Sequence, residues 1–237
     1  MGKLFAIALF GAIVPAAAPA QSDGPIDPFM ELAAQFTEPE VVSVQVEAMM
    51  TAMRSEFAAD PDIADLEAEC PGAIDKSMDV LWDLYSRDQD EEIASYRVEL
   101  AEFFRANMPG DQAGEAAEFY KSELGKKVLR AVGKNRTFSN MARSMVQSED
   151  GGVGMDALAA DMAETNAAVQ DDLQAELFAA SIDLGSREWV ATLGRLRPQL
   201  QEFSLQHLNA ELSPEEDAEA EARITEALTG HIDACYE

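Results

Sequence analysis

The stretch VVSVQVEAMMTAMRSEF, residues 41–57, decides the fold class of this chain. Its apolar side chains recur at steps of three and four residues, the spacing of one face of an α-helix. This stripe consists of Val42, Val46, Met49, Met50, Met53 and Phe57. Thr37 stands before it, followed by Glu38 and Pro39. We expect Thr37 to be the N-cap, because a threonine hydroxyl can accept a hydrogen bond from a free N–H group of the first turn.

The same spacing recurs along most of the chain. Further apolar stripes lie at residues 74–85, 93–107, 158–177, 189–207 and 224–232. No stretch alternates apolar and polar residues for long enough to predict a strand. The sequence therefore predicts an all-α fold, a compact multi-helix bundle.

Local signals refine where these helices begin and end. Two short helices are expected around Ser122, and the helix through 158–177 is expected to continue to Gly185. Pro198 should kink or split the 189–207 helix, because proline lacks the N–H that the helix needs. Ser213 and Glu216 have the spacing of a capping box at the start of the last helix.

Composition limits the classes of function. The 237 residues are 47% hydrophobic and carry a formal net charge of -28. Such a charge repels nucleic acids and anionic membrane surfaces, so we expect neither as a partner. We expect residues 21–237 to form a single domain, with the glycine cluster at 151–154 as the one candidate for an internal boundary.

The first twenty residues have the pattern of a secretory signal peptide. Lys3 supplies the positive charge, Leu4 to Val14 form an apolar run, and Ala18-Pro19-Ala20 matches a cleavage site. The run is too short to span a bilayer. We therefore expect cleavage after Ala20 and a periplasmic or secreted protein without a membrane span.

An exported protein meets oxidising conditions, in which an isolated cysteine pair usually forms a disulfide. The two cysteines here are Cys70 and Cys235, and we expect them to bridge. A metal site is the alternative, because His231 and Cys235 lie four residues apart on one helical face. The sequence offers no second pair of this kind, so the disulfide is favoured and no cofactor or metal is expected.

Charge is distributed unevenly. Seven basic residues fall within 121–143, where Glu123 is the only acid: Lys121, Lys126, Lys127, Arg130, Lys134, Arg136 and Arg143. Residues 149–183 then contain nine acids and no lysine or arginine. The basic stretch is either a docking surface for an acidic partner or one side of a charge-matched helical hairpin, and we favour the hairpin.

The candidates for chemistry are weak. The acidic clusters at 88–92 and 215–221 open predicted helices, where negative charge is favoured in any case. Five methionines have the one-face spacing of exported copper(I) sites but equally suit a helical core: Met49, Met50, Met53, Met141 and Met145. His207 continues an apolar stripe and is expected to be a partly buried, hydrogen-bonded residue. No catalytic constellation is recognisable, so we expect no enzyme.

The stretch FYKSELGKK, residues 119–127, resembles the Phe-Tyr-x-Ser-x-x-Gly-x-Lys signature of an exported bacterial family, domain of unknown function 2059. The resemblance covers about residues 90–150 and marks Phe119, Tyr120, Ser122, Gly125 and Lys126 as structural or interaction residues. It implies an α-helical periplasmic domain and no particular activity or ligand.

The residues of this motif also predict local structure. Ser122 can cap the N–H groups ahead of Gly125, and Gly125 permits another backbone to approach closely. Phe119 and Tyr120 are expected to pack against the apolar face formed by Val128, Leu129 and Val132.

Two functions from different classes fit these observations. The first is a non-enzymatic exported protein that acts through protein contacts, with another protein or as a homo-oligomer. The second is a binding module that holds a hydrophobic or cationic small ligand between helices. A carboxylate-based hydrolase is a weaker third candidate.

Overall fold

The computed structural model describes residues 27–87, 89–148, 151–210 and 213–236. These residues form twelve α-helices and no strand, which confirms the predicted all-α class. The helices are α1 (Pro28–Phe36), α2 (Pro39–Ala59), α3 (Pro61–Glu69), α4 (Ala73–Arg87), α5 (Gln89–Asn107), α6 (Gly110–Lys121), α7 (Glu123–Asn135), α8 (Ser139–Gln147), α9 (Met155–Asp172), α10 (Gln174–Gly185), α11 (Glu188–Leu208) and α12 (Pro214–Cys235). The predicted signal peptide lies outside the described residues. None of the helices in the described part is both long and apolar enough to cross a bilayer.

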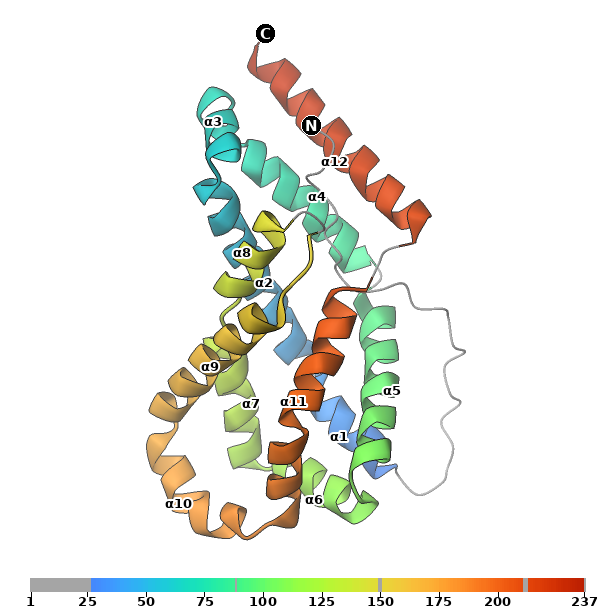
Figure 1. The fold of residues 1–237 in the computed structure, drawn as a ribbon, viewed down its shortest axis with the longest axis vertical. Helices are drawn as coiled ribbons and strands as arrows, with labels where there is room; N and C mark the ends of the chain where they lie inside the picture. The colour runs from blue at the N-terminus through green and yellow to red at the C-terminus, as the bar shows by residue number, and fades with distance from the viewer. Residues whose placement is uncertain (1–26, 88, 149–150, 211–212, 237) are drawn as a thin grey trace.

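Figure 1 shows an elongated arrangement with α12 at one end and α10 at the other. At the first end α12 packs on α4, and α2 contacts α3, α4, α7 and α8. At the other end α1 packs between α5 and α6, and α11 contacts α6 and α9. Helices from both sides of residues 151–154 are in contact, since α9 packs on α7 and α8.

Two large apolar clusters fill the interior. The first, which we name the methionine core, joins α2, α4, α8, α9 and α12. It consists of Val46, Met49, Met50, Met53, Phe57, Ile74, Met78, Leu81, Phe138, Met141, Ala142, Met145, Val153, Leu158 and Ile224. Burial of each large side chain of this kind contributes roughly 1.5–3 kcal/mol relative to exposure.

The second cluster, the aromatic core, joins α1, α5, α6 and α11. Its buried members are Leu32, Ala33, Leu100, Ala101, Phe104, Met108, Ala113, Ala116, Ala117, Trp189 and Leu196. The three buried alanines of α6 have small side chains, so they allow α1 and α11 to approach that helix closely.

Two predicted helix boundaries are wrong, and of the kink or split expected at Pro198 the split is absent. Thr37 is the C-cap of α1 and does not cap α2; its hydroxyl accepts a hydrogen bond from Arg97 Nε at 2.7 Å and donates to Ala33 O at 3.0 Å. The helix expected to run to Gly185 breaks at Leu173, which has non-helical backbone angles and is buried beside Ala131 and Val169. Pro198 does not split α11, which runs through it.

A buried carboxylate on α9 caps α8. Asp161 is completely buried, and its Oδ2 accepts a hydrogen bond from Met141 N at 2.9 Å. Its Oδ1 accepts from Asn140 N at 3.1 Å and from Asn140 Nδ2 at 2.8 Å. The first turn of α8 has free N–H groups and its own N-cap, Phe138, supplies no side-chain acceptor. Asp161, on the neighbouring helix, therefore accepts hydrogen bonds from backbone N–H groups that have no partner within α8 itself.

Arg136 provides positive charge near this carboxylate. Its guanidinium lies over the Phe138 ring, 5.1 Å from the centroid, and its Nε is buried without a hydrogen-bond partner among the described residues. Burial lowers the pKa of Arg136, and attraction to Asp161 opposes that shift. The two charges thus compensate each other where α8 joins α9.

We predict that Asp161→Ala lowers the free energy of unfolding by about 2–4 kcal/mol, because it leaves the buried N–H of Met141 and the part-buried N–H of Asn140 unpaired. Asp161→Asn should cost less, since one acceptor oxygen remains. Urea unfolding measures both variants. Asp171→Ala, an exposed aspartate on the same helix, is the control and should stay within about 0.5 kcal/mol of wild type. A loss in Asp161→Ala no larger than that of the control would contradict the assignment.

Candidate functional site

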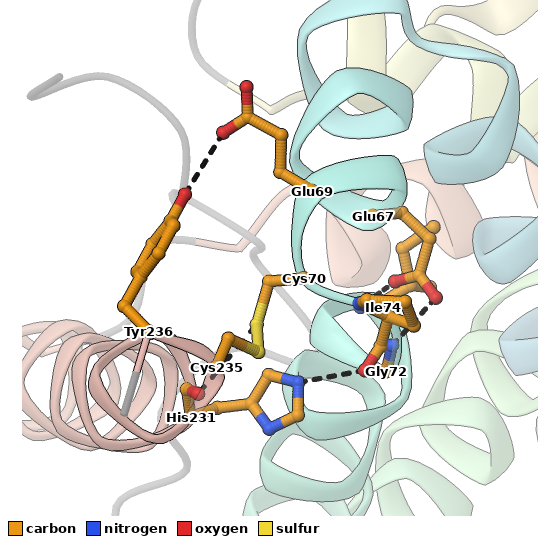
Figure 2. The surroundings of a disulfide bond; sticks show 9 residues. Glu67, Glu69, Cys70, Gly72, Ile74, His231, Cys235 and Tyr236 are labelled. Atoms are coloured by element: carbon orange, nitrogen blue, oxygen red, sulfur yellow. Dashed lines mark hydrogen bonds between the residues drawn. A yellow bond between two sulfur atoms is a disulfide. The ribbon is translucent and has the colours of Figure 1, made fainter.

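The disulfide corner joins the end of α3 to the end of α12 (Figure 2). Cys70 is the C-cap of α3 and is fully buried, whereas Cys235 is an exposed residue at the end of α12. Their Cα atoms lie 5.7 Å apart and they form a disulfide, which confirms the predicted bridge. A loop closed over a separation of 165 residues corresponds to a stabilisation of about 5 kcal/mol in the chain-entropy model.

A tight turn brings Cys70 to this position. Gly72 has φ of +98°, a left-handed conformation that favours glycine. The Glu67 carboxylate accepts hydrogen bonds from Gly72 N at 2.7 Å and Ile74 N at 2.9 Å (Figure 2). These bonds favour the charged form, so the pKa of Glu67 is lowered from its ordinary value of 4.5. The carboxylate fixes the turn and provides hydrogen-bond acceptors for backbone N–H groups at the start of α4.

His231 lies beside the bridge, on the same face of α12 as Cys235 (Figure 2). Its Nε2 is 3.1 Å from the carbonyl oxygen of Pro71. On the far side of the bridge, Tyr236 Oη donates a hydrogen bond to Glu69 at 3.1 Å. The ligand atoms of Cys70, His231 and Cys235 all lie within 4.8 Å of one another. The structure therefore brings a third potential metal ligand to the pair that the sequence suggested.

The motif at 119–127 forms the tight junction between α6 and α7. Ser122 Oγ accepts a hydrogen bond from Gly125 N at 3.1 Å and donates one to Phe119 O at 2.6 Å. A Cβ atom on Gly125 would lie 2.1 Å from Phe119 O and 2.5 Å from Tyr120 Cα. Only a residue without a side chain fits so close to the preceding helix.

The aromatic pair of the motif packs differently from the prediction. Phe119 lies 5.2 Å from Trp189, and Tyr120 lies 4.9 Å from Phe36, as measured between ring centroids. Both belong to the aromatic core, whereas Val128 and Val132 pack in a separate small cluster. Burial raises the pKa of Tyr120 to about 12.

The basic stretch is partly paired with the acidic one. Lys127 Nζ lies 3.6 Å from Glu176 Oε1, and Lys134 Nζ lies 3.0 Å from Asp172 Oδ2. Two other cations pair elsewhere, Lys121 with Glu31 at 2.8 Å and Arg143 with Glu56 at 3.2 Å. Lys126 and Arg130 are exposed and form no ion pair within the described part of the chain. Of the four ion pairs named here, those of Lys127 and Lys134 are the two that the favoured hairpin predicts.

The remaining candidate residues, the five methionines and His207, are engaged in packing and hydrogen bonds within the fold. The five methionines considered for copper lie in the methionine core, packed against apolar side chains. His207 is partly buried, with Nδ1 at 2.8 Å from Phe203 O and Nε2 at 2.8 Å from Glu99 Oε2. Both of its ring nitrogens are thus engaged.

One exposed apolar feature was not anticipated from the sequence. Phe178 on α10 is 81% exposed, and Leu177 beside it is only half-buried. The helical stripe through 158–177 implied a buried face, but the break at Leu173 turns α10 away from the core.

No family model, no curated protein and no solved structure matches this chain. The resemblance of residues 119–127 to the domain of unknown function 2059 family therefore stays a prediction.

We predict that Gly125→Ala lowers the free energy of unfolding by about 1–3 kcal/mol, because the new methyl group collides with backbone atoms of Phe119 and Tyr120. Gly194→Ala is the matched control within α11, since nothing lies within 4 Å of its Cβ position. The control should gain about 0.4–1 kcal/mol from the restricted unfolded chain. Denaturant unfolding of both variants tests this, and equal effects would contradict the close approach.

The lowered pKa of Glu67 predicts a pH-dependent stabilisation. This stabilisation is fully present above pH 4.5, the pKa of Glu67 in the unfolded chain. It is lost as the pH falls through the lower pKa that Glu67 has in the folded protein. Glu67→Gln should therefore be less stable than wild type at neutral pH, and the difference should vanish in acid. Thermal melts over a pH series measure it. A difference that persists unchanged to the acid end would show that the charge of Glu67 is irrelevant.

Proposed function

We propose that this chain is an exported, non-enzymatic helical protein that works by binding another protein through α10. The observation that carries the proposal is the exposed aromatic side chain of Phe178 on a helix with no buried residue among those whose side chains are described. Large aromatic residues dominate the energetics of protein interfaces when a partner covers them. Export is supported by the signal-like N-terminus and by the disulfide, which persists under oxidising conditions.

The surroundings of Phe178 extend the apolar surface. Ala175 and Ala179 are exposed on the same helix, and Leu177 and Ala180 are half-buried. α10 packs mainly on its sequence neighbours α9 and α11, touches α7 through Glu176 and Leu177, and lies at one end of the molecule (Figure 1). A partner can therefore reach it without displacing another helix.

Charge indicates what kind of partner fits. Asp171, beside this helix, is exposed, whereas Asp172, Glu176 and Asp183 pair with Lys134, Lys127 and Arg187. The chain as a whole has a net charge of -28, so the complementary surface is an apolar pocket with a basic rim. A second copy of this chain fits less well, because two proteins with a net charge of -28 repel each other. The family resemblance is compatible with this role, since it implies a periplasmic helical domain.

A photo-crosslinking amino acid at position 178 tests the proposal in cells of the source organism. The captured protein is identified by mass spectrometry, purified and titrated with wild type and with Phe178→Ser. We expect Phe178→Ser to bind at least about tenfold more weakly while melting at the wild-type temperature, as for a central interface aromatic. Val98→Ser is the control, because Val98 is an exposed apolar residue of α5.

Three outcomes would overturn the proposal. The proposal is wrong if the captured protein fails to bind when purified, or if Phe178→Ser binds as well as wild type. It is also wrong if Val98→Ser loses as much affinity as Phe178→Ser. A cross-link only to a second copy, with a dimer in sedimentation, would replace the foreign partner by a homo-oligomer.

A further inference from the structure

The disulfide corner contains three side chains with soft metal-ligand atoms from two distant parts of the sequence. Cys70 comes from the end of α3, while His231 and Cys235 are one helical turn apart on α12. With their ligand atoms all within 4.8 Å of one another, one small ion can contact all three after modest side-chain rotation. Two thiolates and an imidazole are one of the ligand sets that zinc takes in sites with three protein ligands.

The backbone around these residues is already arranged for such a role. The Pro71 carbonyl lies 3.1 Å from Nε2 of His231. Metal-bound histidines usually keep one ring N–H on a backbone carbonyl, which fixes the tautomer and leaves the other nitrogen for the ion. Gly72 lies against the same ring, where a Cβ atom would come within 3.4 Å of it. The loop thus holds the imidazole beside the sulfur atoms.

We propose that Cys70, His231 and Cys235 bind one Zn²⁺ ion when their disulfide is reduced. The disulfide and the zinc thiolate are then two alternative ways of attaching α12 to the end of α3. This site is independent of α10 and of the function proposed for it.

The chemistry requires a dithiol reductant. Its thiolate attacks one sulfur of the Cys70–Cys235 bond, that bond breaks, and a mixed disulfide forms. The second thiol of the reductant then displaces the protein sulfur, so the reductant leaves as a disulfide and the protein holds two thiols. Zn²⁺ replaces both thiol protons, which pass to solvent.

The geometry suits a tetrahedral ion. Zinc–sulfur distances of about 2.3 Å place two thiolates about 3.8 Å apart, which side-chain rotation can reach from a Cα separation of 5.7 Å. Cys70 is buried, His231 is half-buried and Cys235 is exposed, so the fourth position faces solvent and takes water. The nearby carboxylates are engaged elsewhere, Glu67 with backbone N–H groups and Glu69 with Tyr236.

The test uses full-length mature protein reduced by a phosphine, freed of reductant without oxygen and titrated with Co²⁺ and then Zn²⁺. We expect one equivalent of Co²⁺ to produce the thiolate charge-transfer band and the visible bands of tetrahedral coordination. Zn²⁺ should abolish both bands and raise the melting temperature of the reduced protein. The oxidised protein should show none of these changes, because its sulfurs are bonded to each other.

His231→Ala and His231→Gln test the imidazole, and His207→Ala is the matched control, since it is the other histidine of the chain. We expect both His231 variants to bind Zn²⁺ at least about tenfold more weakly, and His207→Ala to bind as wild type does. Circular dichroism of the oxidised variants shows whether each is folded.

The proposal is wrong if reduced wild type gives no thiolate band with Co²⁺, or if both His231 variants keep wild-type affinity. It is also wrong if reduction unfolds the protein and Zn²⁺ does not restore the helical signal.

Discussion

The hydrogen bonds from the start of α8 to the Asp161 carboxylate hold the middle of this molecule together. Helix α8 is only nine residues long, and short helices are marginal without tertiary support. Its buried side chains, Met141, Ala142 and Met145, all belong to the methionine core. When Asp161 fixes the N-terminus of α8 on α9, it also fixes the position from which these side chains enter the core. A charged group is tolerated at complete burial because each oxygen is hydrogen-bonded and Arg136 compensates the charge.

Helix α12 depends on a different kind of attachment. It has 22 residues, yet Ile224 is the buried residue that it contributes to the methionine core. It packs mainly on α4, where Arg223 also forms an ion pair with Asp83 at 2.5 Å. So little apolar contact gives a long helix modest support, and the bond from Cys235 to Cys70 secures its far end. The bridge therefore compensates for the small apolar contact of α12.

The sequence predicted best those features that depend on neighbouring residues. The stripe from Val46 to Phe57 enters the methionine core as expected, and the capping box of Ser213 and Glu216 is formed. The cysteine pair was predictable because two cysteines allow one pairing. Helix α1 was missed because its nine residues show little periodicity beyond Leu32 and Ala33. The break at Leu173 carries no proline or glycine, and it arises because Leu173 packs on α7.

The features that fix the site could not be predicted from local sequence patterns. No sequence pattern near residue 161 indicates that Asp161 caps a helix that begins 22 residues earlier, because that contact exists only after α8 and α9 have packed. The approach of His231 to Pro71 depends in the same way on the placement of α12. Exposure of Phe178 could not be foreseen either, since a large apolar residue of a helix is ordinarily buried.

The separation of 165 residues between the two cysteines has a consequence for biosynthesis. Cys70 emerges from the ribosome long before its partner exists. During synthesis Cys70 is therefore first a single thiol, which oxidation can join to a cysteine of another protein but not yet to Cys235. Cys70 is fully buried only in the finished protein, in which His231 and Cys235 of α12 lie against it. The arrival of α12, the last helix to be made, therefore closes the bridge and ends the exposure of Cys70 to other thiols.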